Sequence, residues 1–146
     1  MRYLRLFVLF VTLYSCSSRF DFEFEKNKSE YTNVVKCVIT NYAKIFDSSG
    51  IGNSRSLYIY DFEKKSICSD WIDFLKKTQI EFVNVKEDST VAFYSKLQGS
   101  IKTRQFALMI NNHPQQKNPE MPLDFTIKKV HGNRWYELER VISVAN

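Results

Sequence analysis

The spacing of apolar side chains predicts one long helix early in the chain. Apolar residues recur every three or four positions across residues 31–46 and form a single stripe along one side of a helix. Ser29 is expected to cap its start, and the turn-forming residues at 47–50 are expected to end it. The stripe consists of Tyr31, Val34, Val35, Val38, Tyr42, Ile45 and Phe46.

A second, shorter helix is predicted at residues 71–77. Ser69 and Asp70 precede it and are suitable N-terminal capping residues. Lys76 and Lys77 lie at its expected end, where a helix favours positive charge. Its apolar side is expected to pack on a sheet.

Period-two alternation and an enrichment in β-branched and aromatic residues predict the strands. His131-Gly132-Asn133 indicates a hairpin turn, because glycine and asparagine tolerate positive φ. The order of elements predicts an α+β domain with one long and one shorter helix packed on a curved antiparallel sheet of about five or six strands. Strands are expected at 54–62, 80–85, 90–94, 104–110, 124–130 and 134–142, with a proline-containing loop at 111–122.

Phe20, Phe22 and Phe24 alternate with acidic residues ahead of the long helix. The alternation is typical of a short strand docked on the domain, and an apolar strip near a membrane would have the same composition. A flexible tether is the third interpretation.

The N-terminus has the pattern of an export signal. Arg2 and Arg5 precede an apolar run of roughly nine residues, from Leu6 to Tyr14. Such a run covers only about half of the ~30 Å hydrocarbon core of a bilayer. It is therefore expected to act as a leader rather than as a transmembrane anchor.

The tetrapeptide Leu13-Tyr14-Ser15-Cys16 resembles the lipobox of bacterial lipoproteins. The resemblance implies that residues 1–15 are removed as a signal peptide and that the Cys16 sulfur carries a diacylglyceryl group. Residues 16–28 would then form the lipid attachment and tether, and residues 29–146 a single domain. Ser17 after Cys16 resembles lipoproteins sent to the outer membrane, so the expected location is the bacterial cell envelope.

An ordinary secretory signal cut near Ser15 or Ser18 is the alternative interpretation of the leader. In that case the mature chain would be a soluble secreted protein. Asn27-Lys28-Ser29 would be a glycan acceptor if the source were eukaryotic.

The element order resembles the helix-then-curved-sheet arrangement of NTF2-like and cystatin-like folds. The closing segment KKVHGNRWYELERV, residues 128–141, looks like the final hairpin of many such domains. The resemblance implies that helices cover the concave face of the sheet, in some members leaving a ligand pocket.

Cys37 and Cys68 are the cysteines that remain behind the leader. In an oxidising compartment they allow one internal disulfide, and two free thiols are the alternative. Cys37 lies roughly 120° from the centre of the apolar stripe, which suits a bridge or partial exposure.

Tyr58, Tyr60, Trp135 and Tyr136 are candidate pocket residues. Aromatic rings supply apolar area with a polar tip, which suits a ligand site, although aromatic residues at strand spacing are commonly core residues. Glu137 and Glu139 lie two positions apart, so a strand places them on one face, where Lys128 or Arg140 would neutralise them.

Composition argues against several other kinds of site. The formal charge is +5, but the lysine pairs are scattered among acids, so nucleic acid is not an expected partner. His113 and His131 lie in or beside turns, where solvated side chains are expected, and their separation does not indicate a metal site. No nucleophile or phosphate-loop motif indicates catalysis or a bound cofactor.

These observations favour a membrane-anchored envelope lipoprotein with a small binding or interaction domain. Its expected partners are the membrane, through the lipid, and a protein, glycan or lipid. An NTF2-like pocket enzyme or a small-ligand-binding protein is the rival hypothesis.

Overall fold

A computed structural model describes residues 20–45, 54–99, 103–111, 122 and 124–142. The long helix, one strand and the shorter helices come first and the other five strands follow, as the element order predicted. The helices are α2 (Phe24–Thr40), α3 (Tyr42–Ile45), α4 (Ile59–Lys65), the 3₁₀ turn η1 (Ser69–Trp71) and α5 (Ile72–Lys77). The strands are β1 (Ser54–Tyr58), β2 (Ile80–Lys86), β3 (Val91–Ser95), β4 (Thr103–Ile110), β5 (Thr126–His131) and β6 (Trp135–Ile142).

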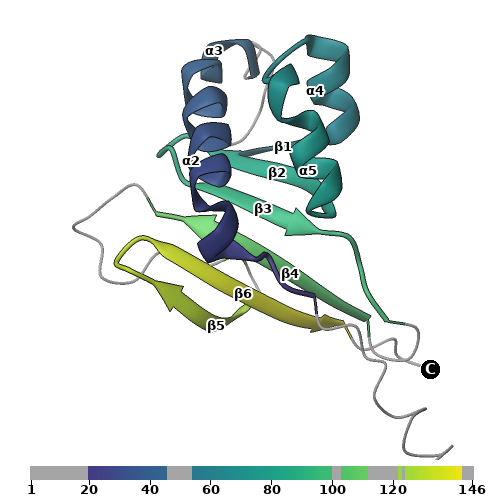
Figure 1. Cartoon of the computed structure of the whole chain (residues 1–146), viewed down its shortest axis with the longest axis vertical. Helices are drawn as coiled ribbons and strands as arrows, with labels where there is room; N and C mark the ends of the chain where they lie inside the picture. The colour runs from purple at the N-terminus through teal and green to yellow at the C-terminus, as the bar shows by residue number, and fades with distance from the viewer. Residues whose placement is uncertain (1–19, 46–53, 100–102, 112–121, 123, 143–146) are drawn as a thin grey trace, which may run out of the picture.

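The six strands form one antiparallel sheet in the order β1-β2-β3-β4-β6-β5. This confirms the predicted α+β class and the predicted strand number. Gly132 has φ +62° in the turn between β5 and β6, the conformation for which the glycine was expected. Figure 1 shows α2, α4 and α5 together on one side of the sheet.

The two faces of the sheet have separate apolar cores. Trp135 packs with the helices and with Phe93, whereas its neighbour Tyr136 packs with Met109 and Leu138 on the other face. Adjacent strand residues point to opposite faces, so β6 contributes to both cores. The larger core lies under the helices. The smaller one lies on the opposite face, which carries none of the described helices and is called the helix-free face below.

The expected strand at Phe20–Phe24 does not form. Phe22 and Phe24 are buried, and α2 begins at Phe24, inside the segment predicted to be a tether. Glu23 caps the helix in a left-handed conformation, with its N–H donating to an Asp21 Oδ1 atom 2.8 Å away. Burial of the phenylalanine rings therefore sets the helix start, and Ser29, the predicted cap, lies within α2.

The predicted long helix is divided near its end. Asn41 separates α2 from the short α3, and its side-chain amide donates to the Cys37 carbonyl at 2.9 Å. This side chain competes with the continuing backbone ladder, which is the usual behaviour of asparagine near a helix end. The predicted end at 47–50 lies outside the described residues.

The strand predicted at 54–62 ends at Tyr58, and Ile59 begins α4. Asp61 accepts a 2.9 Å hydrogen bond from the Tyr58 backbone N–H, which is half of a capping box. That interaction stops the strand, and the first turn of α4 then buries Phe62. The shorter helix is confirmed as η1 and α5, but Ser69 and Asp70 lie within η1 and make no side-chain cap.

Candidate functional site

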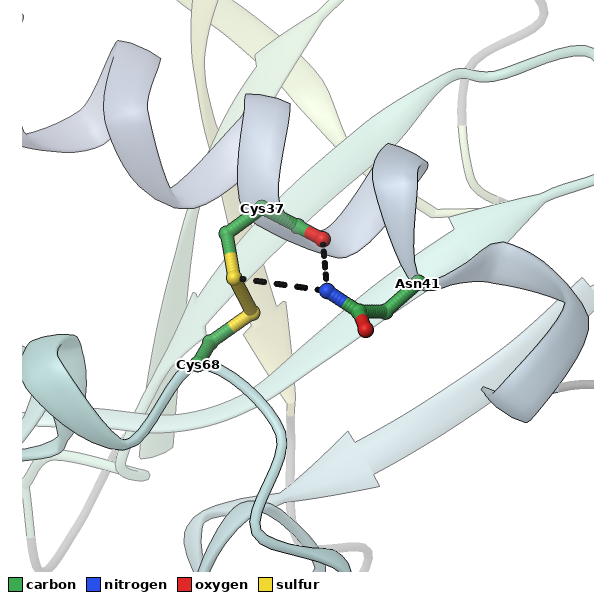
Figure 2. The surroundings of a disulfide bond; sticks show 3 residues. All are labelled: Cys37, Asn41 and Cys68. Carbon is green, nitrogen blue, oxygen red and sulfur yellow. Dashed lines mark hydrogen bonds between the residues drawn. A yellow bond between two sulfur atoms is a disulfide. The ribbon is translucent and has the colours of Figure 1, made fainter.

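A disulfide joins Cys37 of α2 to Cys68, the residue immediately before η1 (Figure 2). The Cα atoms are 5.9 Å apart, and the sequence separation is 31 residues. The Asn41 amide nitrogen lies 3.7 Å from the Cys37 sulfur, beside its bond to the Cys37 carbonyl. The bridge therefore fastens the long helix to the connection between α4 and α5.

The predicted aromatic pocket does not assemble. Tyr58 and Tyr60 are 51% and 64% exposed, and Tyr60 lies on α4 rather than on the strand. Trp135 and Tyr136 are buried in the two different cores. The strand ends before Tyr60, and neighbouring residues of β6 point in opposite directions, so the four rings cannot line one cavity.

An aromatic row crosses the helix-free face of the sheet and consists of Tyr58, Phe82, Tyr94 and Phe125. Tyr58 is opposite Phe82, and Phe82 is opposite Tyr94, so these three side chains share a face. Successive ring centroids are 5.3, 4.5 and 5.7 Å apart. The row runs from the exposed Tyr58 to the buried Phe125.

Arg140 of β6 lies at the buried end of the aromatic row. Its guanidinium carbon is 5.1 Å from the centre of the Phe125 ring, within the range of a cation–π interaction. One terminal nitrogen donates to Gln105 at 2.6 Å, while the buried Nε has no partner. Arg140 also forms no ion pair with any described carboxylate.

Sequence reasoning identified Tyr58 but not the rest of the aromatic row. The strands expected at 80–85 and 90–94 would place Phe82 opposite Phe93, whereas the observed register is shifted by one residue and places Phe82 opposite Tyr94. Phe125 precedes β5 and reaches the row only through the fold. The sequence pattern suggested Arg140 as a partner for Glu137 or Glu139. These two carboxylates lie on the opposite face of the sheet from Arg140.

His131 is buried rather than solvated, with 4% of its side chain exposed. Its Nδ1 lies 2.7 Å from a Glu25 oxygen, and its Nε2 lies 2.5 Å from a Glu137 oxygen. The hydrogen bond between Glu25 and His131 is the main cause of the lowered pKa of Glu25. Nothing in the sequence pattern connected Glu25 with His131 and Glu137.

Glu139 is also buried, and it is neutralised by two cations. Its carboxylate lies 2.6 Å from Lys128 Nζ and 3.4 Å from an Arg104 nitrogen. The predicted pairing with Lys128 is therefore correct for Glu139. Glu137 and Glu139 share a face as expected, but each has its own partners, so they do not form a common acid pair.

A shallow groove runs along the outer side of α2 and has a polar lining. Its residues include Glu25, Lys28, Thr32 and Lys36. These side chains all belong to α2. The groove is therefore not the pocket between helices and a concave sheet that the resemblance to NTF2-like folds implied. In the ranges that the structure describes, no three acidic, histidine or cysteine side chains form a group able to hold a metal ion.

Cys16, Ser17 and the leader lie outside the described residues, as does His113. Over the described parts of the chain, no helix combines the length and apolar character needed to cross a bilayer. No protein-family model matches the chain, and neither the curated proteins nor the solved structures include a significant match.

Proposed function

We propose that this protein is a lipid-anchored envelope protein whose domain binds a partner outside the cytoplasm. The observation that carries its location is the Cys37–Cys68 disulfide, because structural disulfides persist mainly in oxidising compartments. The leader and the Cys16 tetrapeptide support the same location independently. Two or more acyl chains on Cys16 would give stable membrane attachment.

The anchor is tested by the intact mass of the protein purified from its native membrane, compared with a Cys16→Ser variant. The expected mature chain begins at Cys16 and carries acyl mass that the variant lacks. Cys37→Ser is the matched control, because it removes a cysteine of the domain and should keep the acyl mass. A peptide mass without lipid would overturn the anchor.

The binding face in this proposal is the helix-free side of the sheet. Antiparallel sheets covered on one side normally have a polar second face, whereas here that face has an apolar core and an aromatic row. Ile127 and Val130 lie opposite Leu138 and Tyr136, and both are about half exposed, so the apolar surface extends to the β5 edge. Tyrosine and arginine are also the residues that contribute most strongly to protein interfaces.

The occupant that these residues fit best is a protein surface presenting a carboxylate among apolar side chains. Arg140 is a half-buried cation that no described acid neutralises. A carboxylate accepts paired hydrogen bonds from a guanidinium, which gives both charge neutralisation and orientation. The exposed side chains of the same face, Tyr58, Ile127 and Val130, would contact the apolar side chains around that carboxylate.

Site-specific photocrosslinking in intact cells tests this face. A crosslinker at Tyr58 is expected to capture a peptide partner, and one at Tyr60 is not, because Tyr60 is equally accessible but lies on α4. Arg140→Gln should abolish the adduct, whereas Arg104→Gln should keep it, since Arg104 pairs with Glu139. Equal capture at both tyrosines, or an adduct of glycan or lipid mass, would contradict the proposal.

A further inference from the structure

The two edges of the sheet are built differently. β1 and β5 each pair with one strand, so each has main-chain groups on an outer side that no described strand occupies. β5 contains Lys128 and Lys129, and its register with β6 shifts between Ile127 and Lys129. A bulge and lysines are the usual protection of an edge strand against further pairing.

β1 has none of these protective features. Its five residues, Ser54–Tyr58, pair one to one with residues 82–86 of β2, without a register shift. The strand contains neither lysine nor proline, and its single charged residue is Arg55. β1 is therefore the edge of the sheet at which a further strand can be added.

A hydrogen bond at the end of β1 shows which main-chain groups point outward. The Tyr58 N–H donates to Asp61 at 2.9 Å, so it stays out of the ladder with β2 and faces the outer side. Alternate residues of an antiparallel strand direct their N–H and C=O groups to the same side. The groups of Ser56 therefore point outward, whereas those of Arg55 and Leu57 pair with β2. Within the described ranges, no main-chain hydrogen bond outside the sheet uses the N–H or C=O of Ser56.

The side chains of β1 define the kind of strand that fits beside it. Ser56 and the exposed Tyr58 lie on the helix-free face, whereas Arg55 and Leu57 lie on the helix-covered face. Arg55 is half-buried and forms no ion pair with a carboxylate of the described residues. A strand added along β1 places one residue opposite Ser56, within reach of the Tyr58 ring, and the next residue opposite Arg55. An aromatic or aliphatic side chain suits the first position, and an acidic side chain suits the second.

We propose that β1 binds an extended segment of the partner protein by strand addition, with Ser56 exchanging two main-chain hydrogen bonds with that segment. The segment presents an apolar side chain opposite Ser56 and an acidic side chain opposite Arg55. This inference rests on the proposed function, because it states how the partner reaches the exposed end of the aromatic row. A second copy of this chain is a poorer occupant, since its own Ser54–Tyr58 strand has no acidic residue to pair with Arg55.

Amide hydrogen exchange in the purified protein tests the edge itself. After correction for intrinsic exchange, the Ser56 amide should exchange about tenfold or more faster than the amides of Arg55 and Leu57, because it lies outside the ladder. Equal protection of the three amides would mean that the outer side of β1 is already covered. That result would overturn the proposal.

Ser56→Pro tests the strand addition in intact cells that carry the crosslinker at Tyr58. Proline removes the outward N–H of residue 56 and no hydrogen bond of the β1–β2 ladder. The partner adduct should fall about tenfold or more, by the loss of a main-chain hydrogen bond and the clash of the proline ring with an added strand. Ser56→Ala is the matched control, because it keeps the N–H and should keep the adduct.

Arg55→Glu tests the acidic position without touching the main chain. Reversal of the charge should lower the adduct by about fivefold, as for a lost cross-strand ion pair. Retention of the adduct in Ser56→Pro or in Arg55→Glu, while Arg140→Gln abolishes it, would overturn the strand addition and leave the proposed function standing. An adduct between two copies of this chain would overturn the choice of partner, and no adduct at Tyr58 in the otherwise unchanged protein would overturn both proposals.

Discussion

The Tyr31 hydroxyl donates a 3.3 Å hydrogen bond to the Phe22 carbonyl, nine residues earlier in the chain. Tyr31 is fully buried, and its ring connects α2 with the preceding segment, with α5 and with the sheet. Its ring neighbours are Phe22, Phe24, Phe74, Phe93 and Trp135. The chain before α2 is therefore part of the main core.

Removing the Tyr31 hydroxyl should change how stability depends on alkaline pH. Burial raises the pKa of Tyr31 above its ordinary value of 10.0, so the folded protein keeps the phenol neutral while the unfolded chain ionises it. Its contribution is complete below about pH 10 and is lost as the pH rises further. Tyr31→Phe should cost about 1 kcal/mol at neutral pH, through the lost hydrogen bond.

Urea unfolding between neutral pH and pH 11 measures this effect. The free-energy gap between wild type and Tyr31→Phe should narrow above pH 10, because only the wild type loses the Tyr31 contribution. Tyr60→Phe is the control, since Tyr60 is exposed on α4. A constant gap across the whole range would contradict the assigned shift.

Breaking the disulfide should lower the free energy of unfolding by about 3 to 4 kcal/mol, because the bridge no longer restricts a loop of this length in the unfolded chain. The loop spans 31 residues, from Cys37 to Cys68. Denaturant unfolding with and without reductant provides the measurement. The Cys37→Ser/Cys68→Ser double variant should have the same unfolding midpoint as the reduced protein, and reductant should not change it. If reductant left the wild-type midpoint unchanged, the disulfide would have no stabilising role.

The two cations of Glu139 should act as substitutes for each other. Lys128→Met or Arg104→Met alone leaves the buried carboxylate one partner, so each should cost about 1 kcal/mol or less. The double variant leaves the Glu139 carboxylate unpaired and should lower the free energy of unfolding by about 3 kcal/mol or more. This is more than the sum of the two single losses. A double-mutant cycle of unfolding free energies checks this; strictly additive costs would mean that solvent already neutralises Glu139.

Acid should weaken the link between α2 and the hairpin. The hydrogen bond from His131 lowers the pKa of Glu25 below its ordinary value of 4.5. A lowered carboxyl pKa contributes stability that is present above the unfolded value and is lost as the pH falls through the folded value. Unfolding between pH 6 and pH 2 should therefore show an acid-side loss that Glu25→Gln lacks; an identical profile for the two proteins would refute it.

The succession of elements and the hairpins were recognisable from local sequence. The stripe from Tyr31 to Ile45 predicted most of the long helix, and the glycine of the 131–133 turn predicted the last hairpin. The residues at which helices and strands begin and end were harder to predict from the sequence. The cap at Asp61 and the buried Phe24 moved two boundaries, because a side chain's partner is decided by tertiary packing.

The sequence by itself determined the α+β class, the strand number and the pair of cysteines able to bridge, because periodicity and composition are local properties. Only the tertiary structure decided that Trp135 and Tyr136 belong to different cores and that the aromatic row ends at Arg140. It also decided that Glu25 meets His131 across 106 residues. Such contacts depend on sheet register and on how α2 is placed over β6, which no local pattern specifies.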